Sequence, residues 1–534
     1  MPWLTIIGLI PLAGAAVIWL LHVLTRAVGT AAEADGALTV EQQADAPAAA
    51  SGAARVVALG TSLLTLAVTI AMTLQFDTAR AGQFQFAEKV HWIRQLGVSY
   101  ALGVDGIGLT MVLLSTVLVP ICVLAGWNAV SDSRSAHFFA LTLLLETFMI
   151  GVFAARDVFL FYVFFEAMLI PVYFLIGLYG GANRRYAAVK FLLYSLLGGL
   201  VMLVAVIAVY FQGPGGAEGF LTDNLTGLEF SSTTAERLLF AGFFFAFAVK
   251  APMWPVHTWL PDAAAEAPPG VAVLLVGVLD TVGTFGMITL CLPLVPDASK
   301  WAGPVVLALA VVSVLYGALL AIGQSDLKRL IAYTSVSHFG FIVLGIFAMT
   351  STGQSGAMLY MVNHGFSTAA LFLIAGMLIV RRGSAQIADY GGLQRVTPVL
   401  AGSFLVAGLS SLALPGLSSF VSEFLVLAGT YLRYPAVAIV ATLGIILAAL
   451  YILLTYQRMF TGPIRDFSTG WRDLSAREVA VVAPLIAVII ALGFYPKPVL
   501  EVLNPAVAAT MQKAHVTDPG PTVAVQPAAE GTNP

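Results

Sequence analysis

Charged residues are scarce in this sequence. Of its 534 residues, 10% are Asp, Glu, Lys or Arg and 59% are hydrophobic, and the mean hydropathy is +0.93. Average soluble domains carry charge at roughly 25% of their positions, so these residues cannot form a water-facing surface for a chain of this length. The composition therefore excludes a soluble enzyme and predicts a membrane protein.

Cysteine and excess positive charge are lacking as well. Cys122 and Cys291 are the two cysteines, and each lies in an apolar run. An iron–sulfur cluster takes about four thiolates and a zinc site about four ligands, so we expect no metal and no redox cofactor in this chain. The net charge of −3 leaves no basic surface for a phosphate backbone, so nucleic acid is not an expected partner.

Long apolar runs are what the sequence has instead. A helix of about 18 to 25 apolar residues crosses a ~30 Å hydrocarbon core, and runs of that length predict an all-α polytopic membrane protein with about 14 transmembrane helices. The first run follows no basic segment and precedes no small-residue cleavage site, so we expect a retained helix rather than a signal peptide. The predicted helices begin near Trp3, Val56, Ile107, Phe138, Val158, Ala187, Leu238, Gly270, Val305, Leu327, Gly356, Pro398, Pro435 and Val479.

Three polar segments interrupt the apolar runs. Residues 25–55 are rich in Ala, Glu and Asp, and the tail after Asn504 is rich in Pro and Ala. Both compositions predict mobile or weakly ordered chain. Residues 212–235 contain Gly-Pro-Gly-Gly and several acidic residues, and they predict a longer exposed loop.

The basic residues predict how the chain is oriented in the membrane. Lys and Arg are enriched in cytoplasmic segments. If the N-terminus lies outside, most of the basic residues, among them Arg184, Arg185, Lys190 and Lys328, fall on the cytoplasmic side. We therefore predict that both termini lie outside.

Seven ionisable residues lie inside the predicted helices. A charge at the centre of a bilayer costs roughly 2.5 to 3.5 kcal/mol even on the lenient insertion scale, so each such residue needs a partner, water or a function. Most of these residues fall near the middle of their own helix, so they would form a layer at the membrane centre. They are Glu146, Glu166, Lys250, Asp280, His338, His364 and Glu423.

Each of these residues taken alone is also compatible with a structural role. His338 could be a packing residue bonded to a neighbouring carbonyl, and Glu146 could be the ion-pair partner of a Lys or Arg. Glu166 and Lys250 could form a buried ion pair that only fixes helix packing. Seven ionisable residues at one depth together favour a hydrated polar path in the membrane plane. Glu, Lys and His side chains in such surroundings can exchange protons. No cage of carboxylates for Na⁺ or Ca²⁺ is recognisable, although a broken helix could supply carbonyls.

Proline interrupts two of the predicted helices. Pro252 and Pro255 fall at the end of the seventh, and Pro415 falls in the twelfth, ahead of Glu423. Interrupted helices five apart predict two inverted five-helix repeats, although Pro is also generally commoner in transmembrane helices. The expected division of the chain is an N-terminal part at 1–136, repeats at 137–295 and 303–462, and a last helix with a disordered tail at 463–534.

Four motifs resemble the antiporter-like subunits of respiratory complex I, and the likeness runs from about Tyr100 to Tyr495. The acid in Phe-Val-Ser-Glu423-Phe resembles the subunit M branch, the bacterial counterpart of mitochondrial subunit 4, because the sibling subunits L and N usually have Lys there. The motifs are Phe164–Pro171, Lys250–Ala263, Asp326–Phe341 and Leu414–Phe424.

The resemblance implies a proton-translocating subunit in the membrane arm of a NADH:quinone oxidoreductase, in a bacterial inner membrane. It implies that Glu166 and Lys250 form the first-half pair, that His338 and His364 carry protons through the second half, and that Glu423 is the terminal exchange site. NADH, FMN, iron–sulfur clusters and quinone would be bound by partner subunits. The implied contacts are with the other complex I subunits, especially the two sibling antiporter-like subunits, and with membrane lipid.

The sequence departs from the family pattern at two positions. The family usually has a Lys near Asp280 or Thr281 as the link between the halves, and this chain has none there. Asp280 could take over the relay with opposite charge, or water and Thr284 could form the link. The family commonly has His where this chain has Ala264, so a proton-uptake role for that His does not carry over.

Two other functions remain open from the sequence. The large subunit of a multi-subunit cation/proton antiporter shares the Glu166 and Lys250 motifs, whereas His338 and Glu423 in their full motifs favour complex I. A stand-alone solute transporter would need a substrate site, and none is recognisable in the sequence.

Overall fold

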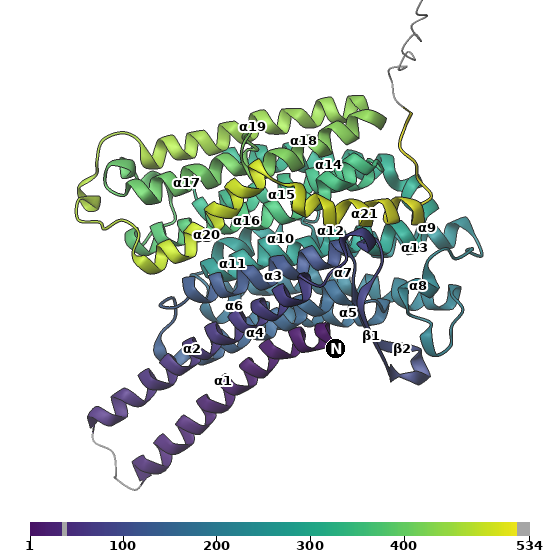
Figure 1. Ribbon diagram of the computed structural model, residues 1–534. Helices are drawn as coiled ribbons and strands as arrows, with labels where there is room; N and C mark the ends of the chain where they lie inside the picture. Colours follow the sequence, from purple (N-terminus) through teal and green to yellow (C-terminus); the bar gives the residue numbers. More distant parts are fainter. Residues whose placement is uncertain (35–39, 521–534) are drawn as a thin grey trace, which may run out of the picture.

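The computed structural model describes residues 1–34 and 40–520 as a bundle of helices packed side by side (Figure 1). The α-helices are α1 (Trp3–Ala34), α2 (Val40–Thr73), α3 (Gly106–Ala125), α4 (Asp132–Ala154), α5 (Val158–Ala167), α6 (Leu169–Tyr179), α7 (Arg184–Gln212), α8 (Thr222–Leu225), α9 (Thr233–Lys250), α10 (Trp259–Glu266), α11 (Pro269–Leu274), α12 (Asp280–Gly286), α13 (Leu292–Leu294), α14 (Pro296–Ile322), α15 (Leu327–Phe347), α16 (Ser351–Arg382), α17 (Pro398–Ser411), α18 (Ser418–Arg433), α19 (Pro435–Phe460), α20 (Ala476–Phe494) and α21 (Lys497–Lys513). Two π-helical segments, η4 (Leu275–Leu279) and η5 (Met287–Cys291), make one continuous rod with α11, α12 and α13. Short 3₁₀ turns lie at Thr78–Arg80, Arg94–Leu96, Gly216–Glu218, Ile387–Asp389, Leu393–Arg395 and Asp466–Ser468.

Within the described part of the chain, 12 helices or helix pairs are long and apolar enough to cross a membrane. The prediction of a helical, polytopic membrane protein is confirmed, with one β-hairpin as the exception described below. Two further apolar helices are interrupted: α9 ends at Lys250 and the chain re-enters helix in α10, and α17 is separated from α18 by Leu412–Leu417. Both interruptions fall at the prolines that the sequence marked.

Parts of the segments at 25–55 and after Asn504 are helical in the structure, and their mobility stays a prediction. Helix α1 continues to Ala34 and α2 begins at Val40, and residues 35–39 lie outside the described part. Alanine has the highest helix propensity, so an Ala-rich segment can be helical without an apolar face. The tail forms α21 up to Lys513, and residues 521–534 are not described.

A β-hairpin, which the sequence did not predict, marks one face of the bundle. Strands β1 (Gln85–Ile93) and β2 (Val98–Val104) pair antiparallel, and the Glu88 carboxylate accepts the backbone N–H of Leu4 at 2.8 Å. The face that carries this hairpin, the start of α1 and the start of α3 is called the hairpin face. Successive helices run from this face to the opposite face and back.

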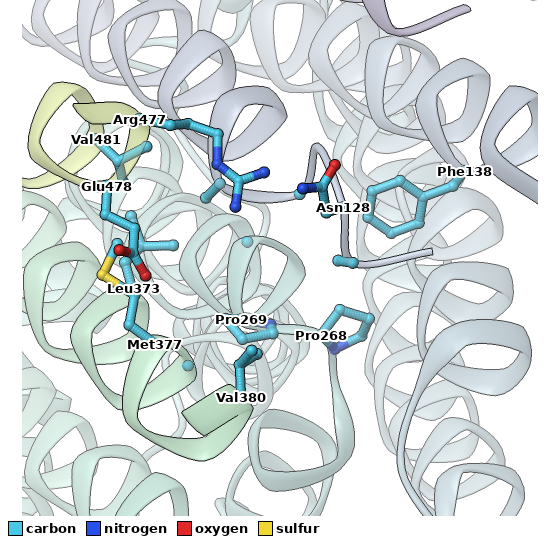
Figure 2. Close-up of a pocket in the computed structure, with 15 residues that line it drawn as sticks. Asn128, Phe138, Pro268, Pro269, Leu373, Met377, Val380, Arg477, Glu478 and Val481 are labelled. Carbon is cyan, nitrogen blue, oxygen red and sulfur yellow. The ribbon is translucent and has the colours of Figure 1, made fainter. Parts of the chain in front are cut away.

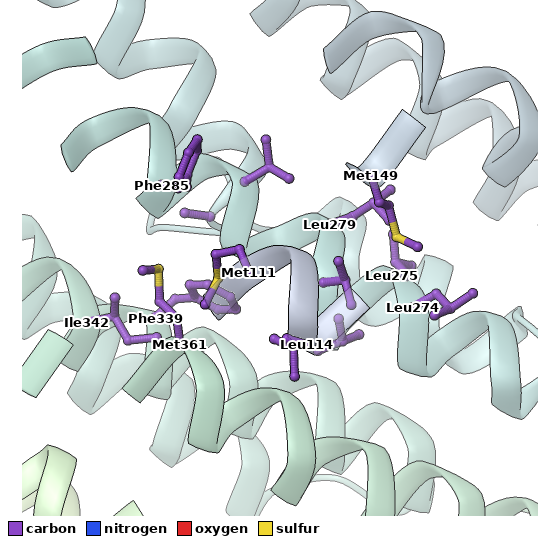
Figure 3. Packing of buried hydrophobic residues seen from close by; sticks show 14 of the residues in the cluster. Met111, Leu114, Met149, Leu274, Leu275, Leu279, Phe285, Phe339, Ile342 and Met361 are labelled. Carbon is purple, nitrogen blue, oxygen red and sulfur yellow. The ribbon is translucent and has the colours of Figure 1, made fainter. Parts of the chain in front are cut away.

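Burial divides the helices into a central group and a peripheral group. In the most apolar 18-residue stretch of each helix, all residues are buried in Pro269–Leu294 and 94% in α16, against 33% in α1 and 22% in α20. Figure 3 shows the dry seam at the centre, where Met111, Leu279, Phe285, Phe339 and Met361 from four helices meet. The most buried helices are those that carry Asp280 and His364, so these polar groups are held by packing on every side.

Candidate functional site

The structure places the predicted site residues in the interior. Six of the seven have at most 4% of their surface exposed, and Glu166 is partly buried. The first-half residues come from α4, α5, α9 and α12, and the second-half residues come from α15, α16 and α18.

Lys250 is the last residue of α9, where the helix is broken. Pro252 and Pro255 cannot donate backbone hydrogen bonds, and the carbonyl of Val249 instead accepts the indole N–H of Trp259 at 2.9 Å. The Lys250 ammonium has no hydrogen-bond partner among the described residues and lies 5.1 Å from the ring centre of Phe165. The break therefore leaves a cation at the end of a helix with an aromatic wall and no fixed partner.

Glu166 and Asp280 are the two acids whose negative charge acts on this cation. Each interacts with the charge of Lys250. Gly199 on α7 makes room for the Glu166 carboxylate, because a Cβ at that position would collide with it. Gly283 on α12 likewise has no side chain to meet the carbonyl of Phe247, so α9 and α12 approach closely. Glu166, Lys250 and Asp280 thus form one group.

Asp280 lies between the two π-helical segments of the central rod. Such segments are rare and are frequent at functional sites. Neither carboxylate oxygen of Asp280 has a hydrogen-bond partner among the described residues. Thr281 and Thr284 donate to the carbonyls of Val278 and Thr281 at 2.6 and 3.0 Å. The Thr284 hydroxyl also lies 2.9 Å from the Met361 sulfur, so neither hydroxyl donates to Asp280, whose carboxylate has no donor among the described residues.

The two histidines of the second half are in contact. Nδ1 of His338 on α15 lies 3.3 Å from Nδ1 of His364 on α16, so one ring can donate to the other. Nε2 of His338 lies 3.0 Å from the carbonyl of Ser411, the last residue of α17. The interruption of the twelfth predicted helix supplies this carbonyl. The packing role considered for His338 is therefore present together with its contact to a second titratable group.

Tyr360 connects this pair to Glu423. Its hydroxyl donates to Oε2 of Glu423 at 3.1 Å, and its ring centre lies 5.8 Å from that of His338. The sequence prediction missed Tyr360. The available signal was its position one helical turn before His364, which places both on one face of α16.

Glu146 on α4 stands apart from both groups. It is fully buried, and neither of its oxygens has a hydrogen-bond partner among the described residues. It forms no ion pair with a described residue, which weighs against the ion-pair role considered for it. Its place in the polar layer rests on its depth alone.

A cluster of charges joins the two halves at the face opposite the hairpin. The Asp262 carboxylate on α10 pairs with Lys190 on α7 at 2.7 Å and with Arg329 on α15. Lys328 donates to the carbonyls of Ala265 and Ala267. The cluster therefore ties α15, from the second half, to the α10 segment of the first.

A cavity of about 130 Å³ opens at the same face, between α3, α16 and the start of α20 (Figure 2). Pro268, Met377 and Val481 line it, and the Arg477 guanidinium points into it near Asn128. None of the seven site residues lines this cavity. This cavity is therefore separate from the seven predicted site residues.

Comparisons with known proteins agree with this arrangement. Residues 155–448 match the family model described as NADH:quinone oxidoreductase/Mrp antiporter, TM. NADH-quinone oxidoreductase subunit M of Mycobacterium tuberculosis is 48% identical over 98% of this chain and 96% of its own length. A chain of respiratory complex I from Thermus thermophilus with bound NADH has a TM-score of 0.83 at 31% identity, covering 96% of this chain and 100% of that one.

The Mrp complex from Dietzia sp. also matches, with a TM-score of 0.81 at 22% identity over 96% of this chain and 99% of that one. At 22% identity, this likeness is evidence for a shared fold only. The identity to subunit M over nearly the whole chain is the more specific finding. Together with the buried Glu, Lys and His layer, it shows that the chain belongs to the NADH-quinone oxidoreductase subunit M family of respiratory complex I.

Proposed function

We propose that this chain translocates protons across a bacterial inner membrane, as one membrane-arm subunit of a NADH:quinone oxidoreductase. The observation that carries the proposal is the buried layer of ionisable residues on seven interior helices, in which lone groups such as Lys250 and Asp280 have no fixed partner. Unpaired charges at this depth are costly, and they are retained mainly where they bind or move ions.

The contacts support a route with two parts. In the first half, Glu166 and Asp280 hold the charge of Lys250 between them, so a change of charge on either acid alters how firmly Lys250 keeps its proton. In the second half, His338 and His364 pass protons to each other, and Tyr360 packs against His338 and hydrogen-bonds Glu423, so it positions this acid next to the histidine pair. Glu423 is the terminal exchange site, and Glu146 takes part from its position on α4.

The same proposal includes the architecture of the membrane domain. The 12 candidate spans and the two interrupted helices make fourteen, with inverted repeats at 137–295 and 303–462. The hairpin face would be the outer face with both termini on it, because Lys190, Lys328 and Arg329 lie at the opposite face.

Electron transfer belongs to other subunits in this proposal. NADH, FMN, iron–sulfur clusters and quinone would be held there, and this chain would contact the two sibling antiporter-like subunits and membrane lipid. Its own part is to bind and release protons when charges elsewhere in the complex are displaced.

The test is proton pumping by the assembled complex with Glu166→Gln. We expect pumping and coupled quinone reduction to fall by about 100-fold, the range in which a single acid or base contributes, while NADH oxidation by an artificial acceptor is unchanged. Glu501→Gln, which changes an exposed acid paired with Lys497 at 3.5 Å, is the control and should pump normally. Full pumping by an assembled Glu166→Gln complex would refute the assigned role.

Asp280→Asn separates the relay role of this acid from a packing role. Asn has nearly the same shape but cannot take up or release a proton, so we expect a large loss of pumping with normal assembly. Asp297→Asn, at an exposed i,i+3 pair with Lys300, is the matched control. Unchanged pumping by Asp280→Asn would assign Asp280 to packing and leave the link between the halves to water and Thr284.

Cation/proton antiport remains the second candidate, because the matching family model covers both classes of protein. The two functions differ in their ion. If Na⁺ added to sealed vesicles drives proton movement in the absence of NADH and quinone, antiport is the activity; strict dependence on quinone reduction supports the first proposal.

A further inference from the structure

A layer of phenyl rings separates the first-half ionisable group from the hairpin face. The rings belong to Phe153 on α4, Phe161 and Phe165 on α5, Phe247 on α9 and Phe285 on α12, and none is more than 5% exposed. We call these five residues the phenyl layer. Neither the resemblance nor the proposed route gives them a role.

The position of each ring along its helix defines the layer. Phe153 follows Glu146, Phe161 precedes Glu166, Phe247 precedes Lys250 and Phe285 follows Asp280, each by three to seven residues. At 1.5 Å per residue, these four rings stand about 5 to 10 Å along the helix axis from the ionisable residue of their own helix, whereas Phe165 directly precedes Glu166. The displacement is toward the hairpin face in every case, because α4 and the central rod end at that face, whereas α5 and α9 begin there.

The rings are in contact with one another. The ring centre of Phe285 lies 5.1 Å from that of Phe153 and 6.5 Å from that of Phe161. Phe161 lies 6.0 Å from both Phe165 and Phe247, and the last two are 6.2 Å apart. Four helices therefore close a continuous apolar partition, and its Phe165 ring faces the Lys250 ammonium.

A cavity of about 40 Å³ with several polar residues in its lining lies on the other side of this partition. Phe153, Phe161 and Phe285 form its inner wall. The cavity can hold water, because about 10 to 15 Å³ of this measure suffices for one molecule. Its remaining lining at the hairpin face includes Asp105, Thr222, Asp223, Thr289 and Lys513.

We propose that the phenyl layer is a dry barrier that prevents protons on Glu166, Lys250 and Asp280 from passing directly to the hairpin face. Proton transfer needs a chain of water or polar groups, and an apolar constriction without polar atoms excludes both. The barrier closes the direct exit to the hairpin face and leaves lateral transfer to the histidines of the second half as the proposed route. This inference rests on the proposed proton translocation, and it adds a reason why the pump does not leak.

The test is the passive proton leak of the whole complex in sealed liposomes. A pH gradient is imposed without NADH, and its decay is followed for the wild type, Phe161→Ala and Phe285→Ala. We expect decay several-fold faster in both variants, and fewer protons pumped per NADH during turnover. Phe460→Ala is the matched control, because Phe460 is fully buried and its ring centre lies 4.9 Å from that of Phe404, away from the phenyl layer.

Two further variants keep the test decisive. Phe161→Leu keeps the position apolar, so we expect its pH gradient to decay at the wild-type rate. Phe161→Tyr removes no ring and adds one hydroxyl, so it should leak even if the alanine variant fails to assemble. If the pH gradient decays at the wild-type rate in every assembled Ala and Tyr variant, the phenyl layer is not the proton barrier. The leak assay uses no NADH, so its result does not depend on the pumping assay. A wild-type complex that pumps no protons during turnover would refute the proposed function, whereas the leak assay tests only the barrier.

Discussion

Replacing Lys250 with Ala is expected to abolish proton pumping by the assembled complex and to slow coupled quinone reduction by about 100-fold. The side chain is 1% exposed, and its ammonium has no hydrogen-bond partner among the described residues. Glu166 and Asp280 both interact with this charge. Glu166 and Asp280 are coupled through the Lys250 ammonium. When the ammonium is removed, a change of charge on one acid no longer affects the other through a shared partner.

Lys250→Arg distinguishes a mobile proton from a fixed charge. Arg keeps the positive charge but does not release its proton in proteins, so we expect pumping to be lost as in Lys250→Ala. Proton pumping, quinone reduction and NADH oxidation by an artificial acceptor are measured together. Lys300→Ala, at an exposed ion pair, should leave all three unchanged. If Lys250→Arg pumps normally, Lys250 contributes a permanent positive charge and does not carry a proton.

Glu423→Gln is expected to have an effect of similar size, because it removes the acid that we propose as the terminal proton acceptor of the second half. The carboxylate is 4% exposed and its recorded side-chain partner is the Tyr360 hydroxyl. Gln preserves volume and still accepts this hydrogen bond, so the loss of pumping would come from proton exchange and not from packing.

Tyr360→Phe tests whether Glu423 needs the Tyr360 hydrogen bond or only its own ability to take up and release a proton. It removes the hydroxyl but leaves Glu423 able to titrate, so we expect partial pumping with a shifted pH profile. Proton-to-electron ratios measured across pH would show the difference. A Glu423→Gln complex that pumps with the wild-type ratio would mean that protons leave by another route.

Much of the site could be predicted from the sequence, because the cost of a charge in an apolar run is a local property. Glu166, Lys250 and Glu423 stand out in any window of about 20 residues, since little else in the window is polar. The broken helices were also predictable, because proline removes a backbone donor wherever it occurs.

Composition alone did not indicate the helices in two polar segments. The tail after Asn504 was judged by its composition, but Leu503, Val507 and Met511 recur at a spacing of four and form the buried face of α21. In residues 25–55, the Ala content that was taken for disorder equally favours helix. Composition describes how many residues of each kind are present, whereas periodicity describes whether they share a face.

The sequence by itself determined that this protein is a helical membrane protein with ionisable residues at mid-membrane depth. The tertiary structure alone decided which of these residues meet: His338 with His364, Tyr360 with Glu423, and five phenyl rings from four helices in one partition. The physical reason is that depth follows from counting along a helix, at 1.5 Å per residue. Contact depends on how each helix is rotated about its axis against its neighbours, and packing over the whole bundle sets that rotation.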